Sequence, residues 1–167
     1  MIFDLASINK PVATATSLMI LVEEGKVSLD EKVKDYVPEF VPYVDPSGKP
    51  GEDARIWHLL THTSGLPPYT EFLGHEGVEK QFGQHLATEQ LAAHIAQLPK
   101  TDPPGTALHY SCLGYITLAY IIKKVSGQDI AQFSQERIFS PLKMKHTFYR
   151  PPEKVRSLCV PTEIVGG

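Results

Sequence analysis

Long hydrophobic runs, an excess of basic residues and clustered cysteines are all missing from this chain of 167 residues. No stretch approaches the roughly 20 apolar residues that a membrane-spanning helix needs. The net charge of -3 gives no basic footprint for nucleic acid. Cys112 and Cys159 have neither metal-motif spacing nor the density of a disulfide scaffold, so free thiols are predicted. These absences argue against a membrane-spanning, nucleic-acid-binding or disulfide-stabilised protein.

Sustained alternation of apolar and polar residues is also missing, and so are internal repeats. The content of 42% apolar and 21% charged residues is typical of a folded globular chain. Helical patterns dominate instead. Helices are predicted over residues 10–24, 28–36, 54–61, 89–97, 111–125 and 129–139. The chain should therefore be mainly α, with little or no sheet of its own.

Particular residues are expected to set the ends of these helices. Gly25 should end the first helix in the left-handed conformation, and Asp53 should cap the third. Residues 18–22 are apolar on all sides, which predicts a central, buried helix. Pro11 predicts a loose or 3₁₀ first turn, with the regular helix starting close to it. Residues 67–87 have no clear period and are predicted to form a loop or lid.

The turn before the first helix holds a serine and a lysine three residues apart, Ser7 and Lys10. On a helical turn such residues share a face, so a hydroxyl can meet an amine acting as its base. A chain of this length should contain about one such spacing by chance. A second one does occur, Ser140 and Lys143, but Pro141 marks it as a helix end. The spacing alone is therefore weak evidence.

Further segments make the first pair specific, because they follow it in a fixed order. Together with the first pair, the ordered segments are Ser7-Ile8-Asn9-Lys10, His62-Thr63-Ser64-Gly65-Leu66, Pro104-Gly105-Thr106, Tyr110-Ser111-Cys112 and Ile138-Phe139-Ser140-Pro141-Leu142-Lys143-Met144. With these segments the chain resembles the serine β-lactamase and penicillin-binding-protein-like hydrolases. Its nearest branch is the one with class C β-lactamases, D-aminopeptidases and esterases. The resemblance extends from Phe3 to about Tyr149.

The resemblance implies a catalytic trio and a small-molecule acyl substrate, with no metal or cofactor. Ser7 is expected to be the nucleophile and Lys10 its proton partner. Lys10 would serve as a base only with a pKa depressed from about 10.4. Tyr110 is expected to relay protons to the leaving group and from the deacylating water. Because a phenol has an ordinary pKa near about 10, the Lys10 ammonium would then either favour the Tyr110 anion or share its proton, and the sequence leaves open which residue holds it.

Cys112 departs from the family pattern, which usually has asparagine at this substrate-binding position. A thiol is a weak hydrogen-bond donor and acceptor. The departure argues against efficient β-lactam hydrolysis and favours an esterase or peptidase-like activity. Cys112 as the nucleophile is the alternative, disfavoured because no histidine-dependent arrangement is evident.

The histidines and aromatic residues have simpler interpretations. His62 is predicted to fix a turn by hydrogen bonding, with Gly65 supplying backbone freedom. His58 and His62 lie four residues apart but lack the glutamate and third ligand of a zinc site, so a metal is not expected. Tyr69, Phe72 and Phe82 either line the mouth of an acyl pocket or hold a loop against the core.

The resemblance also implies that residues 1–167 form only part of a domain. Family members have strands before the serine turn and a Lys-Thr-Gly or His-x-Gly motif after the tyrosine, and neither occurs here. The chain is expected to be the central helical part of an α/β fold, prone to self-association. The start, Met1-Ile2-Phe3-Asp4, lacks a basic secretory segment, which leaves the location undetermined. Rival interpretations are an inactive fragment or sensor-like binding module and, more remotely, a serine amidase of another fold.

Overall fold

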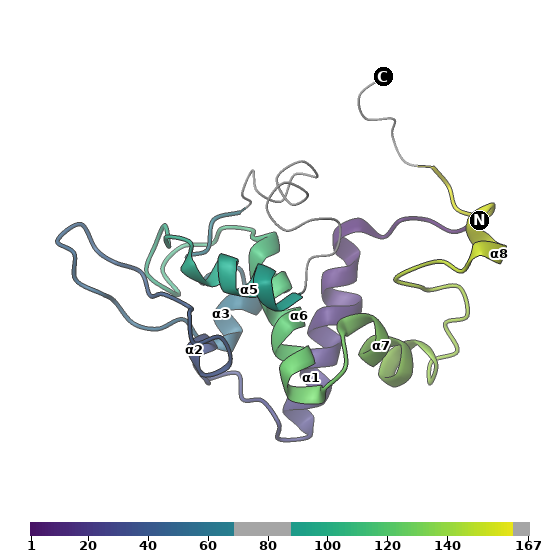
Figure 1. The fold of residues 1–167 in the computed structure, drawn as a ribbon, viewed down its shortest axis with the longest axis horizontal. Coiled ribbons are helices and arrows are strands. Elements are labelled where there is room, and N and C mark those ends of the chain that lie inside the picture. Colours follow the sequence, from purple (N-terminus) through teal and green to yellow (C-terminus); the bar gives the residue numbers. More distant parts are fainter. Residues whose placement is uncertain (69–87, 162–167) are drawn as a thin grey trace.

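The structure is a computed structural model, and it describes residues 1–68 and 88–161. Within these residues the chain is mainly helical, as predicted, and β pairing is limited to three isolated bridges. The central element is helix α6 (Cys112–Ser126), which contacts helices on several sides (Figure 1). None of the described helices is long and apolar enough to cross a membrane. Residues Tyr69, Phe72 and Phe82, and most of the loop predicted around them, lie outside the described part.

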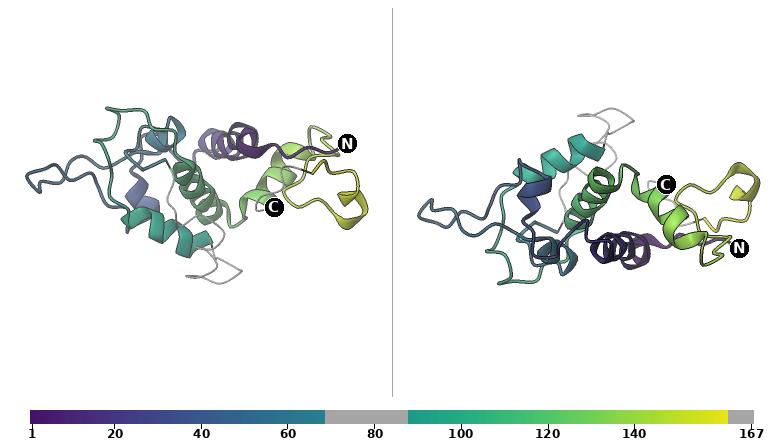
Figure 2. Two further views of the ribbon diagram at one scale, coloured as in Figure 1. Left: turned by 90° about the horizontal axis from the view of Figure 1, so that it is seen from above. Right: turned by 90° about the horizontal axis from the view of Figure 1, so that it is seen from below.

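The helices are arranged along an elongated body (Figures 1 and 2). Helices α2 (Val33–Tyr36), α3 (Ile56–Leu60) and α5 (Thr88–Gln97) lie toward one end. Helix α1 (Thr16–Glu23) runs beside α6 in the middle. Helices α7 (Ile130–Ser134) and α8 (Glu153–Arg156) lie toward the other end, where the segment around Ile2 pairs with that around Cys159.

The first helix begins irregularly because of its proline. A 3₁₀ turn η1 (Ala6–Ile8) leads into a π-helical segment η2 (Lys10–Ala15), and regular α-helix starts only at Thr16. The predicted loose first turn is confirmed, but the start of the regular helix near Pro11 was wrong. Pro11 has no N–H to donate, and its carbonyl accepts from the backbone N–H and the hydroxyl of Thr16, five residues later. Gly25 ends the helix at φ +67°, as expected.

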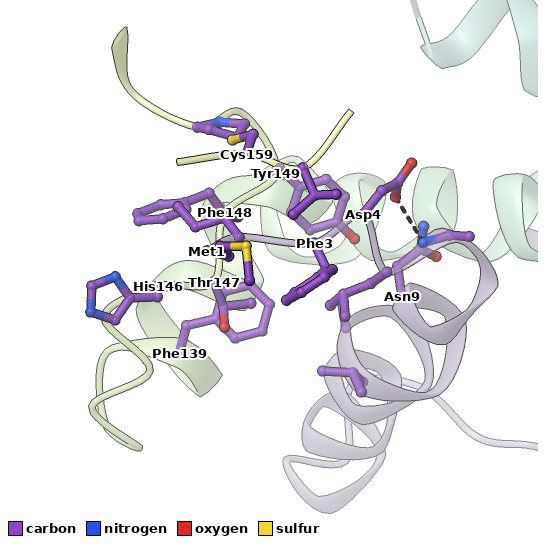
Figure 3. Close-up of a pocket in the computed structure, with 17 residues that line it drawn as sticks. Met1, Phe3, Asp4, Asn9, Phe139, His146, Thr147, Phe148, Tyr149 and Cys159 are labelled. Carbon is purple, nitrogen blue, oxygen red and sulfur yellow. Dashed lines mark hydrogen bonds between the residues drawn. The ribbon is translucent and has the colours of Figure 1, made fainter. Parts of the chain in front are cut away.

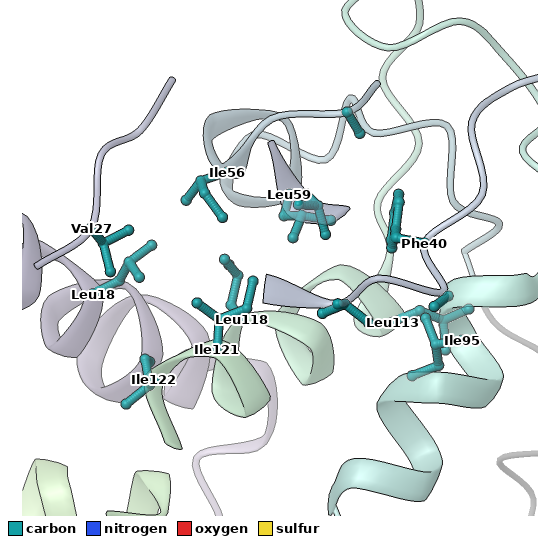
Figure 4. Close-up of a cluster of buried hydrophobic side chains, with 14 of the residues drawn as sticks. Leu18, Val27, Phe40, Ile56, Leu59, Ile95, Leu113, Leu118, Ile121 and Ile122 are labelled. Atoms are coloured by element: carbon teal, nitrogen blue, oxygen red, sulfur yellow. The ribbon is translucent and has the colours of Figure 1, made fainter. Parts of the chain in front are cut away.

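The core is packed around α6 and one side of α1 (Figure 4). Leu18 and Leu21 of α1 are fully buried, whereas Met19 is 60% exposed. The predicted burial of residues 18–22 therefore holds for Leu18 and Leu21 but not for Met19. Burial of each large aliphatic side chain contributes about 1.5–3 kcal/mol. The fully buried residues of this core include Leu18, Leu21, Ile56, Leu59, Leu113, Leu118, Ile121 and Ile122.

The predicted helix ends are partly confirmed. Gly127, at φ +76°, ends α6, and the Asp129 carboxylate accepts from the Gln132 N–H to cap α7. Asp53 does not cap α3. It forms ion pairs with Lys32 and Lys34 instead, at 3.0 and 2.7 Å, because these two cations lie next to it on the neighbouring segment.

Other helix bounds moved by a few residues. The helix predicted to open at Ser28 begins only at Val33, and the Glu31 carboxylate accepts from the Ser28 N–H in a turn before it. The helix predicted over residues 129–139 is α7 followed by the π-helical segment η4 (Gln135–Phe139).

Candidate active site

Ser7 and Lys10 meet on the first turn of the chain. The Lys10 Nζ donates to Ser7 Oγ at 2.9 Å. A 3₁₀ turn has three residues per turn, so side chains at positions i and i+3 lie directly above each other. Ser7 lies in η1 and Lys10, three residues later, begins η2, so the tight turn between them brings the two side chains together. The lysine side is buried, with Lys10 only 8% exposed, whereas Ser7 is exposed and accessible to a substrate.

The backbone before Ser7 is strained. Ala6 has φ +43°, a region that residues with a Cβ rarely adopt and that costs about 1–3 kcal/mol. The Asp4 carboxylate accepts from the Ala6 N–H at 2.8 Å and so holds the turn. The positive φ immediately before Ser7 is a feature that the sequence did not predict.

Tyr110 joins this pair from a segment about a hundred residues later. Lys10 Nζ lies 5.2 Å from the centroid of the Tyr110 ring, and the phenol interacts with both Ser7 and Lys10. Tyr110 is 48% exposed and immediately precedes Ser111, the residue before α6. The structure thus brings together the three residues that the sequence singled out for catalysis.

The charges within the trio differ from expectation for Lys10. Burial lowers the pKa of Lys10, but hydrogen bonding to Tyr110 and the charges of Cys112 and Tyr110 outweigh it and raise that pKa above its ordinary value. Hydrogen bonding to Ser7, then to Lys10, lowers the pKa of Tyr110. The geometry therefore favours a Lys10 ammonium beside a Tyr110 phenol that loses its proton more readily. It agrees with the expected alternative of a Lys10 ammonium that favours the Tyr110 anion, and not with a partly neutral Lys10 that acts as the base itself.

Cys112 lies at the edge of the same site. It is the first residue of α6, is partly buried, and interacts with Lys10 by charge and hydrogen bonding. Its N–H donates to the Pro68 carbonyl at 3.2 Å. Both Cys112 and Cys159 are free, as predicted. A role of Cys112 in binding substrate stays a prediction.

A series of hydrogen bonds joins the segment at residues 62–68 to the segment at residues 101–112. The His62 carbonyl accepts from the His109 N–H at 2.9 Å, and the Thr63 carbonyl accepts from the Gly105 N–H at 2.8 Å. The Ser111 hydroxyl donates to the Pro67 carbonyl at 2.7 Å. The segment at residues 62–68, which includes His-Thr-Ser-Gly-Leu, therefore holds the segment at residues 101–112, which carries Tyr110, in position.

Gly65 allows the close approach of these two segments. It has φ +77°, as the predicted backbone freedom requires, and its carbonyl accepts from the Thr101 N–H at 2.8 Å. A Cβ on Gly65 would lie 2.2 Å from the carbonyl oxygen of Asp102. Only glycine fits at this position.

His58 and His62 do not converge on a common point. The His58 Nδ1 accepts from the Arg55 N–H at 2.8 Å, whereas the His62 Nδ1 accepts from the Ser111 N–H at 3.1 Å. Among the described residues, no group of three or more histidine, cysteine or acidic side chains is placed to share a metal ion. Both imidazoles instead accept a backbone hydrogen bond, which requires an unprotonated Nδ1.

These two histidines predict that acidification destabilises the fold. Burial lowers the pKa of His58 and of His62 below 6.5. The charge of Arg55 lowers the pKa of His58 further, and the charge of Lys10 lowers the pKa of His62 further. A histidine with a depressed pKa contributes stability that is present above its unfolded pKa and lost as pH falls through its folded pKa. The free energy of unfolding, from urea titrations, should therefore fall between about pH 7 and about pH 5, before the carboxylates titrate. A constant value across this window would contradict the two hydrogen bonds.

A cavity of about 540 Å³ lies next to the Ser7 turn (Figure 3). Phe3, Phe139, Phe148 and Tyr149 give it an aromatic lining. Leu5 and Ala6 line it too, but Ser7, Lys10 and Tyr110 do not. The cavity therefore adjoins the trio without containing it.

The second serine–lysine spacing has none of these features. Ser140 and Lys143 are both exposed, and the Ser140 hydroxyl accepts from the Gln135 side chain at 3.0 Å. The interpretation of this pair as accidental agrees with its surroundings. Ser140 is consequently a suitable control for experiments on Ser7.

Comparison with known proteins identifies the family. A family model described as Beta-lactamase matches residues 1–162. The chain belongs to the β-lactamase family. The resemblance that the sequence motifs indicated is confirmed, and with it the nature of the fold: the chain corresponds to a helical part of a β-lactamase-like structure.

Individual members of the β-lactamase family give the scale of the similarity. An N-acetylmuramyl-L-alanine amidase of Bacillus subtilis is 33% identical over 152 residues, which are 91% of this chain and 34% of the relative. The chain spans about a third of the length of the curated relatives it matches.

Solved structures agree with this placement. A β-lactamase/D-alanine carboxypeptidase from Yersinia pestis is 28% identical, with a TM-score of 0.70, covering 91% of this chain and 42% of that one. EstCE1, a hydrolase with promiscuous acyltransferase activity, is 30% identical with a TM-score of 0.66, covering 84% and 38%.

Proposed function

We propose that this chain carries the nucleophilic part of a serine hydrolase that acts through an acyl-Ser7 intermediate on an ester, amide or β-lactam. The hydrogen bond of 2.9 Å between Lys10 Nζ and Ser7 Oγ, with Tyr110 beside both, carries the proposal. An unassisted serine hydroxyl is a poor nucleophile and needs an adjacent base. The amidase and D-alanine carboxypeptidase among the relatives favour an amide substrate of the peptidase type.

In the proposed reaction, Ser7 Oγ attacks the carbonyl carbon of the substrate and passes its proton to Tyr110. The Lys10 ammonium stabilises the phenolate that accepts this proton. Tyr110 then donates the proton to the leaving group, and the bond between that group and the acyl carbon breaks. Water, deprotonated in the same way, hydrolyses the ester and restores Ser7. The Ser7 N–H, at the first turn of a helix, would be one donor to the oxyanion.

Covalent labelling of Ser7 tests the proposal. Intact-mass spectrometry of the chain, after incubation with a fluorophosphonate or a penicillin, should show one adduct per molecule. Ser7→Ala should abolish the adduct, because no other group in the trio is a comparable nucleophile. Ser140→Ala should leave it unchanged, since that serine lies outside the site. An adduct that persists in Ser7→Ala would refute the assignment.

The rival function is a binding module that retains the site but does not turn over. The half-exposed Tyr110 and the exposed Ser7 favour it, because catalysis benefits from a site that excludes water. A penicillin adduct that forms slowly and is never released would support the module, and so would the absence of an adduct with either reagent. Self-association of the chain also stays a prediction, for which the exposed Met1, Phe3 and Met19 are candidates.

A further inference from the structure

His62 lies in the segment at residues 62–68 and joins it to the backbone on either side of Tyr110. Its carbonyl accepts from the His109 N–H at 2.9 Å, and its ring Nδ1 accepts from the Ser111 N–H at 3.1 Å. These are the residues immediately before and after Tyr110. One histidine therefore holds the backbone on both sides of the tyrosine, across 49 residues of sequence.

The His62 ring also contacts the Tyr110 ring directly. The two ring centroids lie 4.5 Å apart, and the Tyr115 ring follows on α6 at 5.2 Å. The Tyr115 hydroxyl donates to the Leu60 carbonyl at 3.1 Å, which fixes that second ring. The Tyr110 side chain is thus supported by an imidazole that itself packs against a fixed ring.

The conformation of His62 is costly and specific. Its φ is +60°, a left-handed value that histidine and asparagine adopt more readily than most residues. Such strain is retained where surrounding contacts determine it. Here those contacts are the two hydrogen bonds that flank Tyr110.

We propose that His62 is a positioning residue that holds Tyr110 against Ser7 and Lys10, and that it does so only as the neutral imidazole. The proposal rests on the proposed function of the trio. The Ser111 N–H needs an unprotonated Nδ1, so a proton there would place two donors against each other. Protonation of His62 would break one of the two flanking hydrogen bonds and release the tyrosine.

The surroundings of His62 oppose that protonation near neutral pH. Among the described residues, the titratable side chains that face its ring are Lys10, Tyr110 and Tyr115. Burial, followed by the charge of Lys10, lowers the pKa of His62. As pH falls through this depressed pKa, Tyr110 should move away from Ser7 and Lys10. The site should therefore lose its reactivity in mildly acidic solution.

Three variants separate positioning from general stability. His62→Asn keeps an acceptor near the place of Nδ1 and tolerates the positive φ, but it does not titrate. His62→Ala removes the acceptor and the ring. His58→Asn is the matched control, because His58 also accepts a backbone hydrogen bond through Nδ1 but its ring stacks on Trp57.

The test follows the Tyr110 phenol by NMR in the full chain labelled at the tyrosine ring, with Tyr110→Phe to assign its signal. In the unmodified chain the Tyr110 signal should change with pH in two steps. One is the titration of the phenol itself, and the other, at acidic pH, should coincide with the titration of His62. His62→Asn should lose this step and keep the lowered pKa of Tyr110, as measured at higher pH. His62→Ala should return that pKa toward about 10. His58→Asn should behave as the unmodified chain.

Labelling of Ser7 by a fluorophosphonate gives the second measurement. A displacement of the tyrosine of about 1 Å can reduce such a rate by about 10²-fold, which is the loss expected in His62→Ala. His62→Asn should recover most of the rate. If Ser7 is not labelled even in the unmodified chain, the proposed function fails, while the NMR titration still decides the role of His62.

Some results of these experiments would contradict a positioning role of His62. A Tyr110 titration without an acidic step, or one that His62→Asn leaves in place, would overturn the proposal. So would a protonated Nδ1 on His62 at neutral pH, read from the ring nitrogen shifts of the unmodified chain. These measurements need no unstable variant, so the proposal stays testable if His62→Ala does not fold.

Discussion

Tyr110→Phe is expected to slow acylation of Ser7 by about 10²–10⁴-fold, the range that a positioned general base contributes. The phenol is the group in the trio whose pKa is shifted toward releasing its proton, through hydrogen bonding to Ser7 and then Lys10. Phenylalanine keeps the ring that packs on His62 but has no oxygen to accept the proton. Since Tyr110 is half-exposed, its hydroxyl contributes little to the core. The fold should therefore survive the substitution.

The way in which the rate of acylation changes with pH also tests whether Tyr110 is the base. A base with a lowered pKa becomes active at lower pH than a free phenol, so the labelling rate should rise with pH and level off below about pH 10. The raised pKa of Lys10 keeps its ammonium charged across the same range. In Tyr110→Phe the rising limb should disappear along with most of the rate.

Stopped-flow or quenched labelling with a fluorophosphonate, followed by intact mass, measures both quantities. Tyr120→Phe is the control, because Tyr120 lies farther along α6 in the partly buried layer around the core. An unchanged rate and pH profile in Tyr110→Phe would assign the deprotonation of Ser7 to Lys10. The lysine would then have to lose its proton despite its raised pKa.

The helices that the sequence predicted well are those with a complete set of local signals. Helix α6 has apolar residues at helical spacing and ends at Gly127, and α5 ends before Pro99. The meeting of Ser7, Lys10 and Tyr110 was predictable too, but only through the family resemblance. No local pattern links residues a hundred positions apart.

The features that were missed depend on contacts between distant segments. Asp53 looked like a helix cap, but Lys32 and Lys34 lie close enough to bind its carboxylate. The pKa of Lys10 was expected to fall with burial, and burial does lower it, but the neighbouring Tyr110 and Cys112 outweigh that contribution. The imidazole of His62 meets the backbone of Ser111 only because the two segments are joined by hydrogen bonds. Each of these outcomes is decided by a partner that the local sequence does not name.

Gly65→Ala is expected to be the most destabilising single substitution in the supporting segment. The left-handed backbone at φ +77° would cost alanine about 1–2 kcal/mol. The new Cβ would also lie 2.2 Å from the Asp102 carbonyl oxygen and 3.2 Å from the Cβ of Lys100. Forcing atoms apart in a packed region costs a further 1–3 kcal/mol or so, or about 2–5 kcal/mol in total.

Gly25→Ala separates the two contributions, because Gly25 has φ +67° but no atom within 4 Å of its added Cβ. It should lose only the conformational part, about 1–2 kcal/mol, in urea unfolding. Equal losses in the two variants would mean that the approach of Asp102 to Gly65 is not limiting. The extra loss at Gly65 should also slow labelling of Ser7, whereas Gly25→Ala should not. The reason is that the Gly65 carbonyl accepts from Thr101, at the start of the segment that carries Tyr110.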